Sequence, residues 1–135
     1  MSQADVEGFK RAVEAGNRRD YDAVLEEFDP EVEWHPALLA SLEGQPTVYR
    51  GRERVREWFR QMEEVFAELQ TEFSEIRDLD DRIIAIGRIR TRGESSGAET
   101  ESPIAYVTDY KNGKATRIRT FLDPKEALEA AGLRE

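Results

Sequence analysis

The sequence predicts an α+β fold, with helices and a short strand in the first half and an antiparallel meander of strands in the second. Apolar residues recur at helical spacing between Tyr49 and Leu69, which indicates a long amphipathic helix. The stretches that follow alternate in the manner of strands, at about 71–78, 82–92, 99–110 and 114–122. Turn-forming residues separate them, among them Asn112-Gly113, which is typical of a tight β-hairpin.

Composition favours one folded domain over residues 1–135. The charged fraction is 36%, but the apolar residues are grouped periodically, which is unlike a disordered chain. The net charge of −9 argues against a nucleic-acid or anionic-membrane partner, and the absence of cysteine excludes disulfides and thiol chemistry. No apolar run reaches the ~18 residues of a membrane helix, and no signal-peptide core is visible, so we expect a soluble cytoplasmic protein.

Two helices are expected before the first strand. The first extends from about Gln3 to Ala15, where apolar residues share one face, and Gly16-Asn17 provides a C-terminal stop. Asp20 is a suitable N-cap for a short second helix, which Asp29-Pro30 would end.

A strand, a loop and the long helix complete the first half. The strand is expected over Glu31–His35, closed by Pro36, and the loop over 37–47, with room for a helical turn at 37–42. Gly51 is the expected N-cap of the long helix. Its apolar stripe consists of Val55, Trp58, Phe59, Met62, Val65, Phe66 and Leu69. Because this apolar stripe is broad, it must be buried against another element, and we expect the strands that follow to cover it.

The end of the chain carries two further signals. Asp80-Asp81 forms a tight turn between the first strands of the meander. Asp123-Pro124 starts a terminal helix, with an N-cap and a proline at the first helical position, and Gly132 marks its end.

The last strands have one apolar face and one mixed face. The apolar face contains Ile104, Tyr106, Thr108, Ile118, Thr120 and Leu122. The opposite face combines arginine and aspartate with Val107 and Phe121, whereas a solvent face is normally more uniformly polar. We therefore expect a second covered surface, such as a homodimer interface on the outer face of the sheet. Scattered exposed apolar residues are the alternative.

Four motifs span nearly the whole chain: A-G-N-R-R-D at Ala15–Asp20, D-P-E-V-E-W-H-P at Asp29–Pro36, Y-R-G-R-E at Tyr49–Glu53 and F-L-D-P-K-E-A-L at Phe121–Leu128. With the order of the elements, they resemble the nuclear transport factor 2-like superfamily, and within it SnoaL-like proteins and relatives of ketosteroid isomerase. The resemblance implies a curved antiparallel sheet wrapped around three N-terminal helices, a cone of the cystatin-like α+β barrel type. It also implies an internal apolar pocket and, often, a dimer through the outer sheet face.

The resemblance also indicates catalytic candidates. Ketosteroid isomerase uses an aspartate base, with a tyrosine and a protonated aspartate as hydrogen-bond donors. The position of the base falls on His35 here, the position of the protonated acid on Tyr106, and the phenol of the first helix is replaced by Phe9.

His35 is the only histidine, and an ordinary pKa of about 6.5 suits a general base at neutral pH. Glu33, two residues earlier on the same strand face, would orient the imidazole and raise its pKa. The alternative is a half-exposed histidine at a strand end without a catalytic role. The residues expected to contact a substrate are Phe9, Trp34, Tyr49, Trp58, Phe59, Met62, Ile104, Ile118, Thr120 and Leu122, although core packing alone also explains these aromatic residues.

Other chemistries find no support in the sequence. One histidine and no cysteine argue against a metal site. Neither a G-x-S-x-G elbow nor a nucleotide-binding glycine motif occurs, so no cofactor is expected. Two functions remain. The first is a cofactor-independent isomerase, cyclase or hydrolase that uses acid–base chemistry on a small apolar molecule. The second is a non-catalytic small-molecule binder or dimerisation module.

Overall fold

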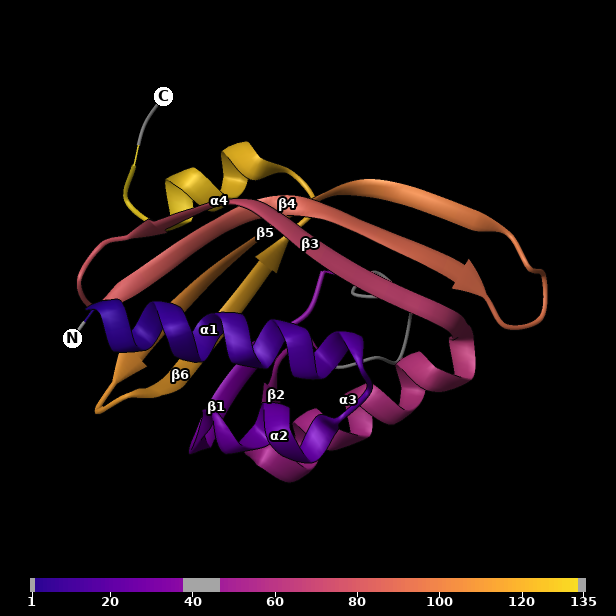
Figure 1. The fold of residues 1–135 in the computed structure, drawn as a ribbon, viewed down its shortest axis with the longest axis horizontal. Coiled ribbons are helices and arrows are strands. Elements are labelled where there is room, and N and C mark those ends of the chain that lie inside the picture. Colours follow the sequence, from indigo (N-terminus) through magenta and orange to yellow (C-terminus); the bar gives the residue numbers. More distant parts are fainter. Residues whose placement is uncertain (1, 38–46, 134–135) are drawn as a thin grey trace.

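The computed structural model describes residues 2–37 and 47–133 and confirms the predicted α+β fold, a curved sheet wrapped around the N-terminal helices (Figure 1). Its elements are α1 (Ser2–Asn17), α2 (Tyr21–Glu26), β1 (Phe28–His35), β2 (Tyr49–Arg50), α3 (Arg52–Val65), β3 (Phe66–Asp78), β4 (Arg82–Gly93), β5 (Glu99–Lys111), β6 (Lys114–Phe121) and α4 (Pro124–Ala130). The helical turn expected at 37–42 lies largely outside the described residues.

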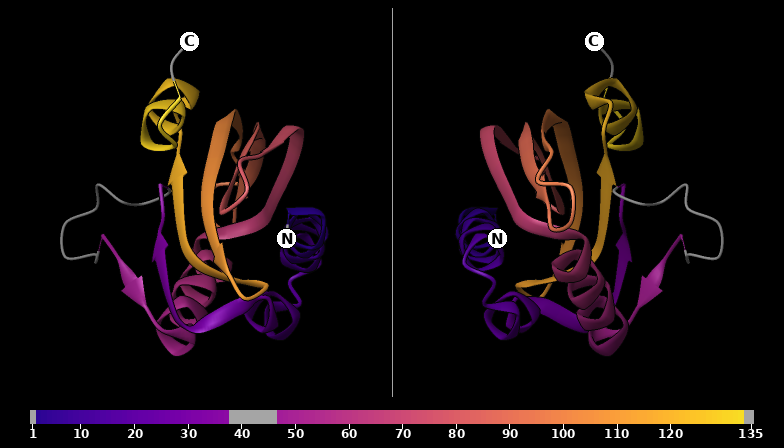
Figure 2. Two further views of the ribbon diagram at one scale, coloured as in Figure 1. Left: turned by 90° about the vertical axis from the view of Figure 1, so that its left-hand side faces the viewer. Right: turned by 90° about the vertical axis from the view of Figure 1, so that its right-hand side faces the viewer.

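The sheet has the strand order β2-β1-β6-β5-β4-β3. All neighbouring strands are antiparallel except β1 and β6, which are parallel, so the sheet is mixed rather than purely antiparallel. The ladder leaves β2 and β3 as the two edges of an open, curved sheet (Figure 2). Helices α1, α2 and α3 lie on its inner, concave side, whereas α4 packs on the outer side.

The long helix is shorter than its apolar stripe. It ends at Val65, and Phe66 is already extended, with φ −119° and ψ 128°. The stripe continues through Leu69, but these residues pair with β4 instead, as in Phe66 opposite Gly93 and Leu69 opposite Thr91. The helical spacing of Phe66 and Leu69 was therefore misleading, because pairing along β4 prevails over local periodicity.

The first strand is longer than expected and includes Asp29-Pro30, which was predicted to end a helix. A proline is tolerated here because the register between β1 and β6 shifts between Phe28 and Glu33. The strand β2, which pairs Tyr49 with Trp34, was missed because its length is too short to produce an alternating pattern.

Caps and turns agree with the sequence. The Asp20 side chain accepts a hydrogen bond from the Ala23 amide, and the Asp123 side chain accepts one from the Lys125 amide at 2.9 Å. Asn112 and Gly113 have φ values of 53° and 79°, as a type I′ hairpin requires.

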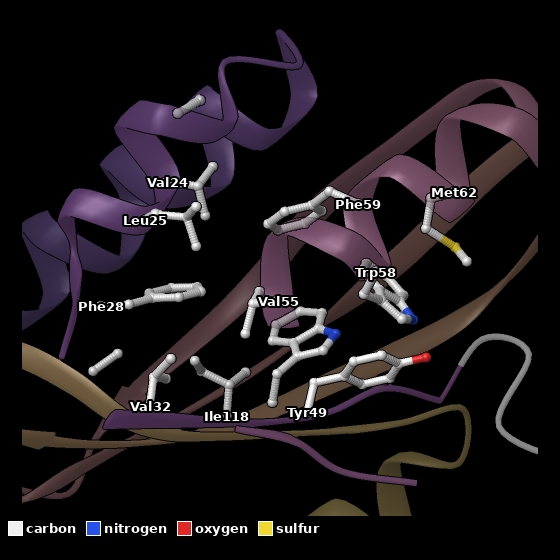
Figure 3. Close-up of a cluster of buried hydrophobic side chains, with 13 residues drawn as sticks. Val24, Leu25, Phe28, Val32, Tyr49, Val55, Trp58, Phe59, Met62 and Ile118 are labelled. Carbon is white, nitrogen blue, oxygen red and sulfur yellow. The ribbon is translucent and has the colours of Figure 1, made fainter. Parts of the chain in front are cut away.

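Two apolar layers cover the two sides of the sheet. On the inner side, Val55, Trp58, Phe59 and Met62 of α3 pack against strand residues such as Val32 and Ile118 (Figure 3). On the outer side, Ala127, Leu128 and Ala131 cover Ile84, Ala105 and Val107. The mixed outer face that suggested a dimer is thus covered in part by α4 of the same chain, and Phe121 packs against this cluster. The homodimer stays a prediction.

Candidate functional site: an aromatic cavity inside the sheet

A cavity of about 100 Å³ lies between the inner face of the sheet and the three N-terminal helices. The helices contribute the aromatic residues Phe9, Tyr21, Trp58 and Phe59 to its wall. The strands contribute Phe28, Trp34, Phe73, Tyr106 and Tyr110. Aromatic rings are rigid and apolar, so this wall is suited to a small organic molecule.

Strand alternation explains why β5 supplies so much of this wall. Ile104, Tyr106, Thr108 and Tyr110 follow at intervals of two and all line the cavity. Between them, Ala105 and Val107 point to the outer layer under α4.

Tyr106 is at the centre of the aromatic wall. Its ring centroid lies 5.1 Å from that of Phe73, 6.2 Å from Phe9 and 6.0 Å from Trp34, each in a T-shaped arrangement. Burial raises the pKa of Tyr106 to about 12, and a hydrogen bond with the Thr71 side chain opposes this rise. The phenol is therefore neutral at physiological pH and able to donate a hydrogen bond.

Several polar groups of the wall are already engaged within the protein. The Asn17 amide donates to the Thr71 carbonyl at 2.9 Å and accepts from the Thr71 amide at 3.0 Å, which fixes α1 to the edge strand β3. The Thr120 hydroxyl donates to the His35 carbonyl at 2.9 Å and accepts from the Ala37 amide at 2.6 Å. These groups position the wall and are not free for a ligand.

Two deeply buried groups of the wall have no hydrogen-bond partner within residues 2–37 and 47–133. They are the Thr108 hydroxyl and the Trp34 indole nitrogen. An unpaired polar group in the interior costs about 1–3 kcal/mol, so a bound molecule that satisfies either group would gain affinity.

One charged side chain lines the cavity in the described part of the chain, the carboxylate of Glu27. Arg11 donates to it from Nε at 2.9 Å and from Nη2 at 3.1 Å. Glu27 is mostly buried, with 20% of its side chain exposed, whereas Arg11 is 60% exposed and lies outside the cavity lining.

The Tyr110 phenol lies in the field of these charges. Its pKa is raised, first by burial and then by the carboxylates of Asp5 and Glu27, while Arg11 opposes the rise. At this phenol the two carboxylates therefore have a larger effect than the one guanidinium.

The structure brings together many of the residues predicted from the sequence to contact a substrate. Phe9, Trp34, Trp58, Phe59, Ile104, Ile118 and Thr120 all line the cavity, as does Tyr106, which was predicted as a catalytic residue. Three others do not: Met62 is buried in the core, the Tyr49 phenol donates to Gln61 Oε1 at 3.3 Å, and Leu122 follows β6 and is 44% exposed. Their alternation or helical spacing was compatible with a position on the cavity wall. In the structure, however, Met62 and Tyr49 are buried away from the cavity and Leu122 is exposed at the surface.

His35 and Glu33 lie on the outer face of the sheet. Because Trp34 points inward, its neighbours in β1 point outward. His35 Nε2 is 3.2 Å from Glu33 Oε1, and Glu33 also pairs with Arg50 at 3.8 Å. The structure thus confirms the proximity of the two side chains, but it does not bring His35 and Tyr106 together.

Two wall residues with ionisable side chains, Tyr110 and Glu27, were missed by the sequence analysis. Tyr110 continues the alternation of Tyr106 and Thr108, so this signal was available. Glu27 sits between α2 and β1, where neither helical nor strand periodicity applies, and no sequence signal separated it from the solvated Glu26.

No group of at least three His, Cys, Asp or Glu side chains in residues 2–37 and 47–133 is arranged to hold a metal ion. No helix of that part of the chain is long and apolar enough to cross a bilayer.

Comparisons with known proteins agree with this architecture. A family model described as a SnoaL-like domain matches residues 9–118. No curated protein matches the sequence.

Several solved structures share the fold. An NTF2-like protein of unknown function from Burkholderia pseudomallei is 23% identical, covers 93% of this chain and 95% of its own, and superposes with a TM-score of 0.82. A putative polyketide cyclase from Xanthomonas campestris is 19% identical, with 96% and 98% covered and a TM-score of 0.77. A hypothetical protein of ketosteroid isomerase-like fold from Catenulispora acidiphila, in complex with trimethylamine, is 12% identical, with 94% and 93% covered and a TM-score of 0.76.

Proposed function

Because the chain belongs to the SnoaL-like family and encloses an aromatic cavity, we propose that it binds a small, mainly apolar organic molecule in that cavity. The observation that carries the proposal is the wall itself, in which aromatic rings from three helices and three strands surround about 100 Å³. An engineered apolar cavity of about 150 Å³ in another protein binds benzene, which sets the scale of the expected ligand.

The ligand carries at least one polar atom in this proposal. Thr108 and Trp34 have buried polar groups without partners in the described ranges, and Tyr106 has a neutral phenol. A hydroxyl or carbonyl group on the ligand would compensate the cost of these unpaired groups, whereas a pure hydrocarbon would not.

A thermal-shift series with benzene, phenol and indole tests the binding function. A ligand at one hundred times its Kd stabilises by about 2.7 kcal/mol, which gives a measurable rise in Tm. The substitution Ala12→Phe places a ring from α1 into the cavity and should abolish the shift. His35→Ala, on the other face of the sheet, is the matched control and should retain it. Equal shifts for wild type and Ala12→Phe would refute binding in the cavity.

An acid–base enzyme of the isomerase or cyclase type is a second candidate. Glu27 is the carboxylate on the described cavity wall, and the neutral phenol of Tyr106 is suited to stabilise a developing oxyanion. In this mechanism the general base is Glu27, and not His35 as the sequence analysis predicted. Turnover of an aromatic ketone should then be lost in Glu27→Gln and retained in His35→Ala; the reverse result would return the base to His35.

A further inference from the structure

We propose that the cavity selects small alkylated ammonium ions over neutral and anionic molecules of the same shape. This inference rests on the proposed binding function and adds the charge of the ligand to it. Three features carry it: the neighbouring side chains of Glu27 and Tyr110, the local charge and the aromatic wall.

Two polar side chains of the cavity wall, those of Glu27 and Tyr110, lie close to each other. Asn17, Thr71 and Thr120 are engaged elsewhere on the wall. The Glu27 carbonyl accepts from the Ala115 amide at 3.0 Å, and Ala115 pairs with Tyr110 across β5 and β6. Glu27 and Tyr110 are therefore neighbours on the wall.

The charge near these two side chains is negative. The Glu27 carboxylate lines the cavity, and Asp5 is buried nearby with its Oδ1 unpaired within the described ranges. Arg11 pairs with Glu27 from the solvent side. Lys114, the other cation close by, is directed to the Glu26 carbonyl at 2.6 Å and is exposed. Near Tyr110, the two carboxylates of Asp5 and Glu27 are therefore accompanied by the guanidinium of Arg11, which pairs with Glu27.

The Tyr110 phenol lies in the field of the same charges. The carboxylates of Asp5 and Glu27 raise its pKa more than Arg11 lowers it. A potential that disfavours a phenolate favours a cation at the same place, and it repels a carboxylate ligand.

The aromatic wall adds to this preference. The faces of Trp, Tyr and Phe rings carry negative potential and attract alkylammonium groups, whose charge is spread over apolar surface. Such an ion can contact the rings and the Glu27 carboxylate together, whereas a strongly hydrated inorganic cation would lose its water in an apolar cavity.

Three probes of one shape test the inference. They are choline, its uncharged isostere in which a tert-butyl group replaces the trimethylammonium group, and tert-butylacetate as the anion. By isothermal titration calorimetry, choline should bind at least about tenfold more tightly than the isostere, and the anion should be weakest. The preference should decrease as salt is added, because charge contributes to it.

Matched variants locate the effect. Glu27→Gln keeps the shape of the wall and should remove most of the choline preference. Glu26→Gln removes the same charge one residue away, on an exposed side chain outside the cavity lining, and should preserve it. Circular dichroism checks that both variants fold. If one variant fails to fold, the relative affinities of the wild type for the three probes still test the charge preference.

The outcomes separate the two proposals. If benzene or phenol binds in the cavity but the isostere binds as well as choline, the ammonium inference is overturned and the binding function stands. The same conclusion holds if Glu27→Gln and Glu26→Gln change the preference equally. If none of these molecules binds, both proposals fail.

Discussion

The guanidinium of Arg11 on α1 forms two hydrogen bonds with the carboxylate of Glu27, at 2.9 and 3.1 Å, across sixteen positions of the sequence. This pair joins a surface cation to a carboxylate of the cavity wall, and it connects α1 to the junction of α2 and β1. A bound cation would compete with Arg11 for the same oxygen atoms.

Removing Arg11 should therefore favour cation binding. In Arg11→Gln we expect the affinity for choline to increase about three- to tenfold, because the carboxylate loses its competing partner. Arg18→Gln, a charge change on an exposed residue of the turn after α1, is the control and should leave the affinity unchanged. Calorimetry measures both, and a weaker choline affinity in Arg11→Gln would contradict the competition.

Substitutions at two neighbouring positions of β1 should differ strongly in their effect on stability. Trp34 is 4% exposed and packs on Trp58 and Tyr106, so Trp34→Ala should lower the free energy of unfolding by about 3–5 kcal/mol. His35→Ala removes a partly exposed ring on the outer face, and we expect a change below about 1 kcal/mol. Urea denaturation of both variants compares them directly. A larger loss in His35→Ala than in Trp34→Ala would contradict the assignment of the two faces.

Gly87 should tolerate no side chain. A Cβ there would lie 1.9 Å from the Glu72 carbonyl oxygen and 2.6 Å from the Phe73 Cα, where β3 changes register against β4. Because these are backbone atoms, Gly87→Ala should cost about 3 kcal/mol or more. Gly16→Ala is the matched control, since its Cβ would be 3.8 Å from Val24 Cγ2 and its effect should stay below about 1 kcal/mol. Equal values of Tm for the two variants would refute the close approach.

Stability at alkaline pH should depend on Tyr106. The unfolded chain loses the phenolic proton near its ordinary pKa of 10, whereas the folded chain retains it up to about 12. The stabilisation is thus complete below pH 10 and is lost as pH rises through this interval, by about 3 kcal/mol in total.

Tyr106→Phe should reduce that decline, because the variant has no phenol to titrate at this position. Urea unfolding at a series of pH values gives the slope for each protein. The remaining decline is expected to come from other buried phenols such as Tyr110, whose pKa is also raised. Identical slopes in wild type and Tyr106→Phe would show that the burial of this hydroxyl does not raise its pKa.

Local signals in the sequence determined much of the fold. Alternation located β4, β5 and β6 nearly to the residue, and Asn112-Gly113 and Asp123-Pro124 placed a hairpin and a helix start. These features depend on backbone conformation and on the period of one element, which neighbouring residues specify.

The tertiary structure decided which side of the sheet each residue faces and which residues form a site. His35 was placed with Tyr106 by family position, but a strand reverses its side chains at every residue, so the inward orientation of Trp34 sends His35 outward. Val107 belonged to a mixed face for which a covered surface was expected, such as a homodimer interface, and α4 of the same chain covers this residue. Glu27 became part of the cavity only through the approach of α1 and β6, a contact between distant segments that no local pattern encodes.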